Sequence, residues 1–170
     1  MCIRDSVGGT PGNNATFSVR TTSNPWGLLG TDERVTVVGG LAGITSNGAP
    51  VAITNGMLPP WMSNREERDF VTYVPDVGFV SAGFDASYGA TTVSASILTP
   101  NSRTRVGGDI TINNDQTLDV YALLIDTNNR VFNAAAAGNS TLQVRSGGIM
   151  YRADGNTNTA AITANRIVAD

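Results

Sequence analysis

A short strand-like motif recurs at a nearly constant interval in the C-terminal half of the chain. Thr117-Leu118-Asp119-Val120 returns as Thr141-Leu142-Gln143-Val144, and Arg166-Ile167-Val168 continues the series. Self-similarity at an interval of about 24–25 residues is typical of a solenoid, in which each coil buries its apolar side only against neighbouring coils. We therefore predict aliphatic columns through the coils, one of Val93, Leu118, Leu142 and Ile167 and another of Leu124 and Ile149.

The composition indicates strands joined by tight turns. The 170 residues include 19 glycines, 16 asparagines and 20 threonines, and sustained helical spacing of apolar residues is hard to find. Threonine, valine and isoleucine favour strands, whereas asparagine and glycine tolerate the positive φ angles of sharp corners. The predicted fold class is all-β: a parallel, right-handed β-helix solenoid with irregular loops, forming an incomplete window of a longer solenoid. An antiparallel β-sandwich is the alternative, because four weakly matching repeats can arise by chance in a Thr- and Val-rich chain.

Strands and turns alternate along most of the sequence. The predicted strands are Thr16–Thr21, Arg34–Val38, Val51–Thr54, Phe70–Val74, Thr91–Leu98, Asp109–Ile112, Leu118–Ile125, Arg130–Asn133, Thr141–Arg145, Gly148–Arg152 and Ala160–Ala169. The predicted turns are Asn47-Gly48, Asn55-Gly56, Asn113-Asn114-Asp115, Asn128-Asn129, Gly147-Gly148 and Asp154-Gly155-Asn156.

Three regions follow from these patterns. Residues 1–6 resemble translated sequencing-adapter sequence, so we interpret them as a non-native leader. Residues 7–90 are predicted to form an irregular β region with an inserted charged loop, and residues 91–170 to form regular β-helix coils of about 24–25 residues.

Several classes of chemistry are excluded by composition. The chain has no histidine, so a Ser-His-Asp triad, a Cys-His pair and an imidazole metal site are ruled out. Cys2 is the single cysteine, which excludes an intrachain disulfide and a cysteine-rich zinc site. The net charge is -3 and the arginines are scattered, which argues against a nucleic-acid surface. No apolar run approaches the roughly 20 residues of a transmembrane helix, and no cofactor is expected.

Three stretches resemble one family. Residues 30–62 contain Ile53-Thr54-Asn55-Gly56-Met57-Leu58-Pro59-Pro60-Trp61, residues 69–80 begin Asp69-Phe70-Val71-Thr72-Tyr73, and residues 117–170 contain Leu142-Gln143-Val144-Arg145-Ser146-Gly147-Gly148-Ile149. In this order they are similar to the N-G-I-L-P-W-A, D-F-A-T-Y-D and L-x-L-x-S-G-G-L passages of autotransporter-associated beta-strand repeat proteins. The resemblance implies a right-handed β-helix stalk in a bacterial passenger protein, secreted or on the outer-membrane surface of a Gram-negative-type bacterium, often adhesive and without catalytic residues.

One segment departs from the family pattern. Where the family has a short neutral turn, residues 64–69 read Asn-Arg-Glu-Glu-Arg-Asp. We consider this segment, with aromatic stacking faces nearby, as a candidate recognition loop for a glycan or a cell-surface protein. Its residues are Trp61, Arg65, Glu66, Glu67, Arg68 and Tyr73. The alternative interpretation is a solvated loop in which opposite charges compensate one another.

The aspartates and the calcium-like D-G-N-T-N segment are expected to be surface and turn residues rather than sites of catalysis or metal binding. Asp119 and Asp126 are the pair most able to meet on a coil surface, with Arg145 one coil further on, yet aspartates commonly occupy turns and outward strand positions. Residues 154–158 read D-G-N-T-N, but Thr159 and Asn165 stand where a calcium loop requires glycine and glutamate. We therefore predict neither an enzyme nor a metal site.

The sequence thus favours a structural β-helical segment of a large passenger protein, whose partners are the flanking coils of the same polypeptide. The alternatives are a polysaccharide lyase or hydrolase on a β-helix scaffold and a segment of a phage tail spike.

Overall fold

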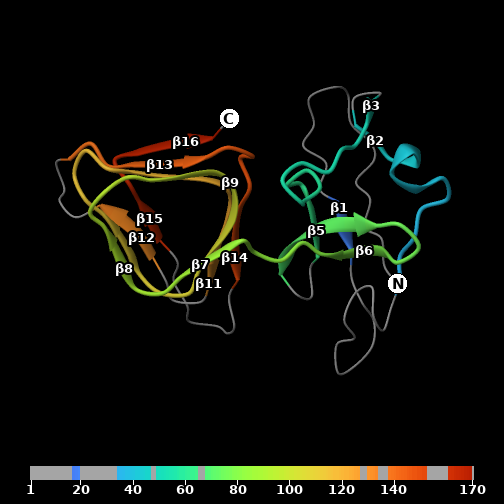
Figure 1. Cartoon of the computed structure of the whole chain (residues 1–170), viewed down its shortest axis with the longest axis horizontal. Coiled ribbons are helices and arrows are strands. Elements are labelled where there is room, and N and C mark those ends of the chain that lie inside the picture. Colours follow the sequence, from blue (N-terminus) through green and yellow to red (C-terminus); the bar gives the residue numbers. More distant parts are fainter. Residues whose placement is uncertain are drawn as a thin grey trace. The chain divides into compact units, whose positions relative to one another are not determined.

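The structure is a computed structural model that describes residues 17–19, 34–46, 49–64, 68–126, 130–133, 138–152 and 161–169. The chain divides into two compact units, Met1–Gly83 and Phe84–Asp170. Strands dominate both units, and one short 3-10 helix, Gly40–Gly43, is the helical element of the described residues (Figure 1). The predicted all-β class is therefore confirmed.

The second unit is a parallel β-solenoid of about three turns. Its strands are β7 (Ala86–Tyr88), β8 (Thr91–Val93), β9 (Ile97–Val106), β10 (Ile110–Ile112), β11 (Thr117–Asp126), β12 (Arg130–Asn133), β13 (Thr141–Val144), β14 (Ile149–Arg152), β15 (Ala161–Thr163) and β16 (Arg166–Ala169). Every pairing among them is parallel. The sandwich alternative is thereby excluded for this unit.

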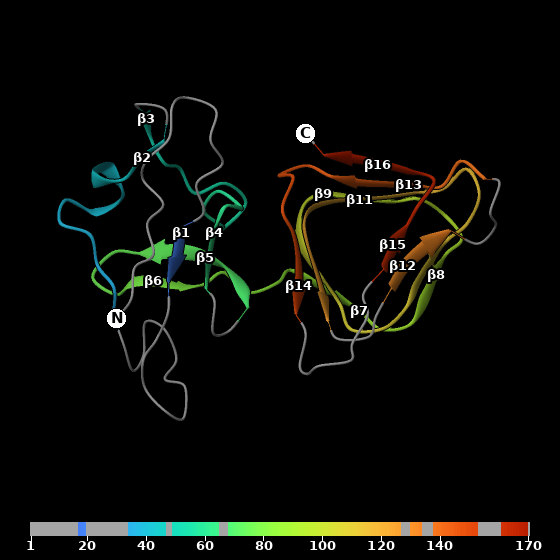
Figure 2. The same cartoon turned by 180° about the vertical axis from the view of Figure 1, so that it is seen from behind.

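Three sheet faces enclose the core of the solenoid. The first face is β8-β10-β12-β15, as seen on one side of the coils in Figures 1 and 2. The long strands β9 and β11 each bend, so that their first halves form a second face with β13 and β16. Their second halves form a third face with β7 and β14. The bend coincides with a register shift between Val120 and Ala122.

On the second face, the predicted interval of about 24–25 residues holds between β11, β13 and β16, but the step from Ile97 on β9 to Leu118 is shorter. Leu118, Leu142 and Ile167 occupy one column, as predicted. On the first face, the interval is uneven. The step from Thr91 to its partner Ile110 is shorter than the predicted interval, and the step from Val131 to its partner Ile162 is longer. The corners, which differ in length, absorb this variation.

Two predicted neighbours in the columns are wrong. Val93 pairs with Ile112 on the first face, and Ile97 takes the place beside Leu118. The chain turns at residues 94–96, which separates the predicted strand Thr91–Leu98 into β8 and the start of β9. Ile149 pairs with Leu123 rather than with Leu124. Leu123 belongs to the core, and alternation along a strand turns Leu124 to the other face.

Inward side chains of successive coils form a continuous apolar core. The central strand β11 contributes Leu118, Val120, Leu123 and Ile125, which are almost completely buried. Fully burying an aliphatic side chain of this size stabilises a fold by about 1.5–3 kcal/mol. Because the strands of each coil pair with those of the neighbouring coils, the stability of a coil depends on its neighbours.

The first unit is built differently. Its elements are β1 (Phe17–Val19), η1 (Gly40–Gly43), β2 (Thr45–Ser46), β3 (Ala49–Pro50), β4 (Met62–Asn64), β5 (Asp69–Val74) and β6 (Gly78–Ser81). Strands β4, β5 and β6 form an antiparallel sheet, and β1 joins it parallel to β4. The core consists of Val35, Val51, Leu58, Met62, Val71, Tyr73 and Phe79.

Two predicted strands of this unit are not strands. Residues 34–38 and 51–53 have irregular backbone, and Thr54 forms only an isolated bridge with Met57. Val35 and Val51 still supply core side chains, and the carbonyl of Val35 accepts a hydrogen bond from Phe79 N at 3.0 Å. Their β-branched side chains fit the core without a strand ladder, which explains why local composition misleads here.

Three predicted turns are confirmed by their backbone angles. Asn55 and Gly56 both have positive φ, and Thr54 and Met57 exchange two hydrogen bonds across them. Asp115 and Gly147 also have positive φ. The predicted turns at 47–48, 128–129 and 154–156, like the leader 1–6, lie outside the described residues. In the described part of the chain, no helix is long and apolar enough to cross a membrane.

Candidate functional site

The candidate recognition loop begins and ends on buried polar residues. Asn64 at the end of β4 pairs with Asp69 at the start of β5, and both side chains are buried. The Asp69 carboxylate accepts hydrogen bonds from Phe70 N at 2.7 Å and from the Ser81 hydroxyl. The antiparallel pair therefore gives the segment between these residues a fixed base.

The members of the predicted loop set separate. Arg65, Glu66 and Glu67 lie outside the described residues. Arg68 is exposed and has a positive φ of 50°. Trp61 is half-buried and packs against the core of the first unit. The charged residue and the indole are thus presented differently, one to solvent and one largely to the interior.

Tyr73 is a core residue rather than an exposed stacking face. It is 8% exposed, and its ring meets Phe79 edge-on, with centroids 5.3 Å apart. Its hydroxyl accepts a hydrogen bond from Val37 N at 3.3 Å. Strand alternation places Tyr73 on the same side as Val71, which is also buried.

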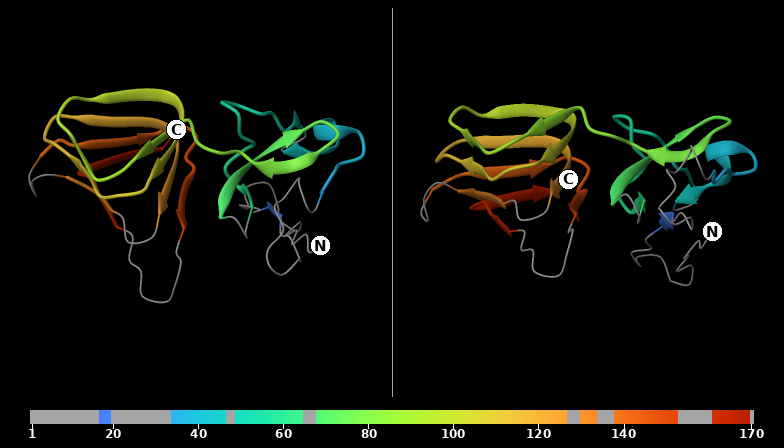
Figure 3. Two further views of the ribbon diagram at one scale, coloured as in Figure 1. Left: turned by 60° about the horizontal axis from the view of Figure 1, so that its bottom comes forward. Right: turned by 90° about the horizontal axis from the view of Figure 1, so that it is seen from below.

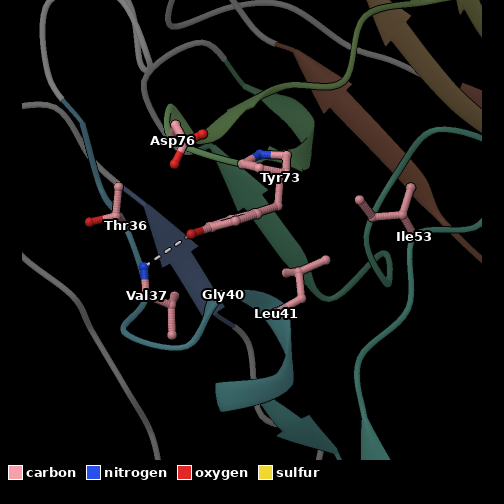
Figure 4. Close-up of a pocket in the computed structure, with 8 residues that line it drawn as sticks. Thr36, Val37, Gly40, Leu41, Ile53, Tyr73 and Asp76 are labelled. Atoms are coloured by element: carbon pink, nitrogen blue, oxygen red, sulfur yellow. Dashed lines mark hydrogen bonds between the residues drawn. The ribbon is translucent and has the colours of Figure 1, made fainter.

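A surface depression lies beside Tyr73 in the first unit (Figure 4). Its volume is about 620 Å³, and its lining residues are Thr36, Val37, Gly40, Leu41, Ile53, Tyr73, Pro75 and Asp76. Asp76 supplies the one carboxylate of this lining, at a turn where its φ is 66°. The Pro75-Asp76 pair is a turn signal in the sequence, but the other lining residues carry no pattern that would have grouped them.

The depression lacks the groups needed for acid–base catalysis. Hydrolysis of a glycosidic bond uses two carboxyl groups about 5–9.5 Å apart. Among the described residues of this lining, Asp76 is the one acid, and no second carboxyl group accompanies it. The arrangement suits apolar contact more than chemistry.

In the solenoid, the predicted neighbours Asp119 and Arg145 do meet. Arg145 donates from Nε to Asp119 Oδ1 at 3.0 Å and from Nη2 to Oδ2 at 2.8 Å, forming a two-pronged ion pair between adjacent coils. The Asp119 side chain is only 6% exposed. Both oxygens of this carboxylate are therefore engaged by one guanidinium group.

Asp126 is held between two arginines from the coils on either side. Arg105 Nε donates to its Oδ2 at 2.6 Å, and Arg152 Nη2 lies 2.7 Å from its Oδ1. Asp119 and Asp126 are therefore engaged by separate arginines, and the two carboxylates do not form the acid pair considered from the sequence.

A third carboxylate, that of Asp85, forms an ion pair with the first coil. Arg103 donates from Nη2 to Asp85 Oδ1 at 2.7 Å and from its backbone N to Oδ2 at 2.9 Å. The side-chain hydrogen bond from Arg103 is the main cause that lowers the pKa of Asp85 below its usual value. Like the other two, this carboxylate is committed to an arginine.

A polar column follows one corner of the solenoid. Ser96 donates to Gln116 Oε1 at 3.2 Å, and Ser140 donates to Asn165 Oδ1 at 2.9 Å. One position earlier, Asn139 Nδ2 donates to Asp115 Oδ1 at 3.1 Å. These bonds link consecutive coils where the chain turns from the first face to the second.

No group of three or more His, Cys, Asp or Glu side chains able to hold a metal ion occurs among the described residues. The D-G-N-T-N segment at 154–158 falls outside them. Comparisons of the chain with models of protein families, with curated proteins and with solved structures found no match.

Proposed function

We propose that this chain is a non-enzymatic β-helical segment of a large secreted or outer-membrane passenger protein. The observation that carries the proposal is that apolar columns and ion pairs both run from coil to coil. Asp126 is bound by Arg105 from one neighbouring coil and by Arg152 from the other. Such a stack resists bending and proteolysis because no coil can unfold without exposing its neighbours.

The proposed setting is the surface of a Gram-negative-type bacterium. The resemblance to autotransporter-associated beta-strand repeat proteins supports this setting, as does the parallel solenoid itself. The partners of the solenoid would be flanking coils of the same polypeptide, held by the same columns.

Adhesion is the proposed additional role of the first unit. The charged segment at 64–69 is anchored at both ends by buried residues, Asn64 and Asp69, and presents Arg68 to solvent. A charged segment that begins and ends on fixed residues is typical of loops that recognise glycans or proteins.

The structural role is tested by incubating the whole chain with acidic and neutral polysaccharides and measuring new reducing ends and unsaturated products. We expect no turnover, together with slow proteolysis of the second unit. Turnover that disappears in the double variant Asp119→Ala, Asp126→Ala would reject the proposal in favour of a polysaccharide lyase or hydrolase.

The adhesive role is tested separately on a glycan array and on bacterial and host cell surfaces. A variant with serine at Arg65, Glu66, Glu67 and Arg68 should lose binding, whereas Arg166→Ser in the solenoid should retain it. Equal binding by both variants would contradict a recognition role for the charged segment.

A further inference from the structure

The depression beside Tyr73 has the size and the fixed walls of a ligand pocket. Its volume of about 620 Å³ lies within the range of about 300–1,000 Å³ that is typical of sites for small molecules. Tyr73 is held by two contacts, since its ring meets Phe79 edge-on and its hydroxyl accepts a hydrogen bond from Val37 N. A ligand would therefore meet a wall that is already in place, which lowers the cost of ordering on binding.

Two turns shape the rest of the depression. One turn ends the hairpin of β5 and β6, and the other covers residues 37–40, where Gly40 N donates to Val37 O at 2.9 Å. Figure 3 shows the hairpin, in green, with the 3-10 helix η1, in cyan, beside its turn. Leu41 of η1 and the half-exposed Ile53 contribute aliphatic side chains to the same lining.

The lining combines these aliphatic side chains with a single charge. Asp76 supplies the carboxylate and is exposed, and Figure 4 shows Asp76 and Leu41 on opposite sides of the Tyr73 ring. The chain has no lysine or histidine, and among the described residues no arginine forms an ion pair with Asp76. An apolar surface with one such carboxylate is complementary to a ligand that has an apolar body and one positive charge.

Asp76 also occupies a turn position that favours other residues. Val77 N donates to Val74 O at 3.2 Å, which places Pro75 and Asp76 at the centre of a four-residue turn. The ring of Pro75 fixes a negative φ at the first central position, and the φ of 66° at Asp76 then defines a type II turn. Glycine and asparagine are favoured at the second central position, because most side chains are strained at positive φ.

A comparison with Asp115 separates the two aspartates of this conformation. Asp115 also has a positive φ, and its carboxylate accepts a hydrogen bond from Asn139 of the neighbouring coil. Its carboxylate therefore has a partner within the protein. Asp76 has the same strained backbone without such a partner among the described residues, and strained residues are concentrated at functional sites.

We propose that this depression binds a small organic cation, namely an aliphatic or alicyclic amine. Its ammonium group pairs with the carboxylate of Asp76 through a charge-assisted hydrogen bond. Its hydrocarbon part lies against Leu41, Ile53 and the ring of Tyr73, and each methylene group removed from water adds to the affinity. A lysine side chain of a partner protein carries the same ammonium group but would fill only a small part of this volume, which favours a free small molecule.

The inference does not rest on the proposed passenger or adhesive role. It uses residues of the first unit, and the described lining includes no residue of the charged segment at 64–69. Loss of glycan or cell binding in the serine variant of that segment would therefore leave amine binding unchanged.

An NMR titration of the whole chain with three eight-carbon probes tests the proposal. The probes are n-octylamine, 1-octanol and octanoate, which share a chain length and differ in charge at neutral pH. We expect the amine to bind at least about threefold more tightly than the alcohol, and octanoate to bind more weakly than both, because an exposed ion pair adds a modest increment. The backbone amides of Val37, Leu41 and Ile53 should shift as the amine is added.

Asp76→Asn isolates the contribution of the charge. This variant should bind amine and alcohol equally, with the alcohol affinity of the unaltered chain. Its thermal stability should be equal or higher, because asparagine accepts the positive φ of the turn. The matched control is Asp115→Asn, the same change at another exposed aspartate with positive φ, which should bind the amine like the unaltered chain.

Ile53→Ser tests the apolar part of the depression. Ile53 is 41% exposed, so serine should leave the fold intact and weaken binding of the amine and of the alcohol by a similar factor, about threefold or more. Val74→Ser alters a side chain that is 40% exposed and outside the lining, and it should leave both affinities unchanged.

Several results would overturn the proposal. These are equal affinities of the unaltered chain for amine and alcohol, a preference for the amine that persists in Asp76→Asn, and equal effects of Asp76→Asn and Asp115→Asn. Binding of a lysine-rich peptide without binding of n-octylamine would also overturn it, and would assign the depression to a protein partner.

Discussion

Asp119 and Arg145, 26 residues apart in sequence, form a two-pronged ion pair between adjacent coils of the solenoid. Asp119 is nearly buried, whereas Arg145 is 40% exposed in its side chain. The arginine thus covers the carboxylate and carries its charge to the surface. The same pattern recurs at Asp126, so paired charges accompany the apolar columns on the outside of the stack.

Replacing Arg145 with methionine should destabilise the solenoid by about 2–3 kcal/mol, because a nearly buried carboxylate would lose two charged hydrogen bonds. Urea unfolding followed by circular dichroism measures this change. The control Arg166→Met alters an exposed arginine on β16 and should change the free energy of unfolding by less than about 0.5 kcal/mol. Adding Asp119→Asn to Arg145→Met should restore part of the loss, and strict additivity of the two would argue against direct coupling.

The ion pair between Asp119 and Arg145 could be predicted from the sequence, because the repeat that aligns Leu118 with Leu142 is visible there. Both strands read Thr-Leu-x-Val, so the register between Asp119 and Gln143 and the proximity of Arg145 follow. The contact of Arg105 with Asp126 could not be predicted in this way. Arg105 lies in the second half of β9, and Pro100, Asn101 and Ser102 in the same strand are residues typical of turns.

The other misassigned positions also have physical causes. From Ala122 to Ile125 the chain is continuously apolar, so alternation cannot reveal that Leu123 points inward. In the first unit, the Asn55-Gly56 turn is readable locally. The pairing of β1 with β4, by contrast, joins residues more than forty positions apart and leaves no local pattern.

The ion pair of Asp85 predicts a specific dependence of stability on pH. Because the hydrogen bond from Arg103 lowers the folded-state pKa of Asp85, the stabilisation is fully present above the unfolded-state pKa, near 3.9. It is lost as the pH falls through the lower folded-state value. NMR titration of the Asp85 carboxyl carbon should show a midpoint below that of a model peptide, and Arg103→Gln should move it back up. An unchanged midpoint in the variant would contradict the assigned cause.

Thr104 offers a stabilising substitution. Its side chain is completely buried, and its hydroxyl has no hydrogen-bond partner among the residues that the structure describes. Thr104→Val removes the unpaired hydroxyl with little change in shape and should stabilise the chain by about 1 kcal/mol. Thr99→Val on the same strand serves as control, because the Thr99 hydroxyl donates to Asp119 O at 3.2 Å and its loss should be neutral or destabilising. A loss of stability in Thr104→Val would mean that the hydroxyl is satisfied in solution.

The column of Leu118, Leu142 and Ile167 should show a gradient of energetic importance. Leu142→Ala leaves a cavity between two coils and should cost about 2–5 kcal/mol, whereas Ile167→Ala removes a half-exposed side chain and should cost about 1 kcal/mol or less. Both are measured by urea unfolding followed by circular dichroism. Equal costs for the two variants would contradict the difference in burial between Leu142 and Ile167.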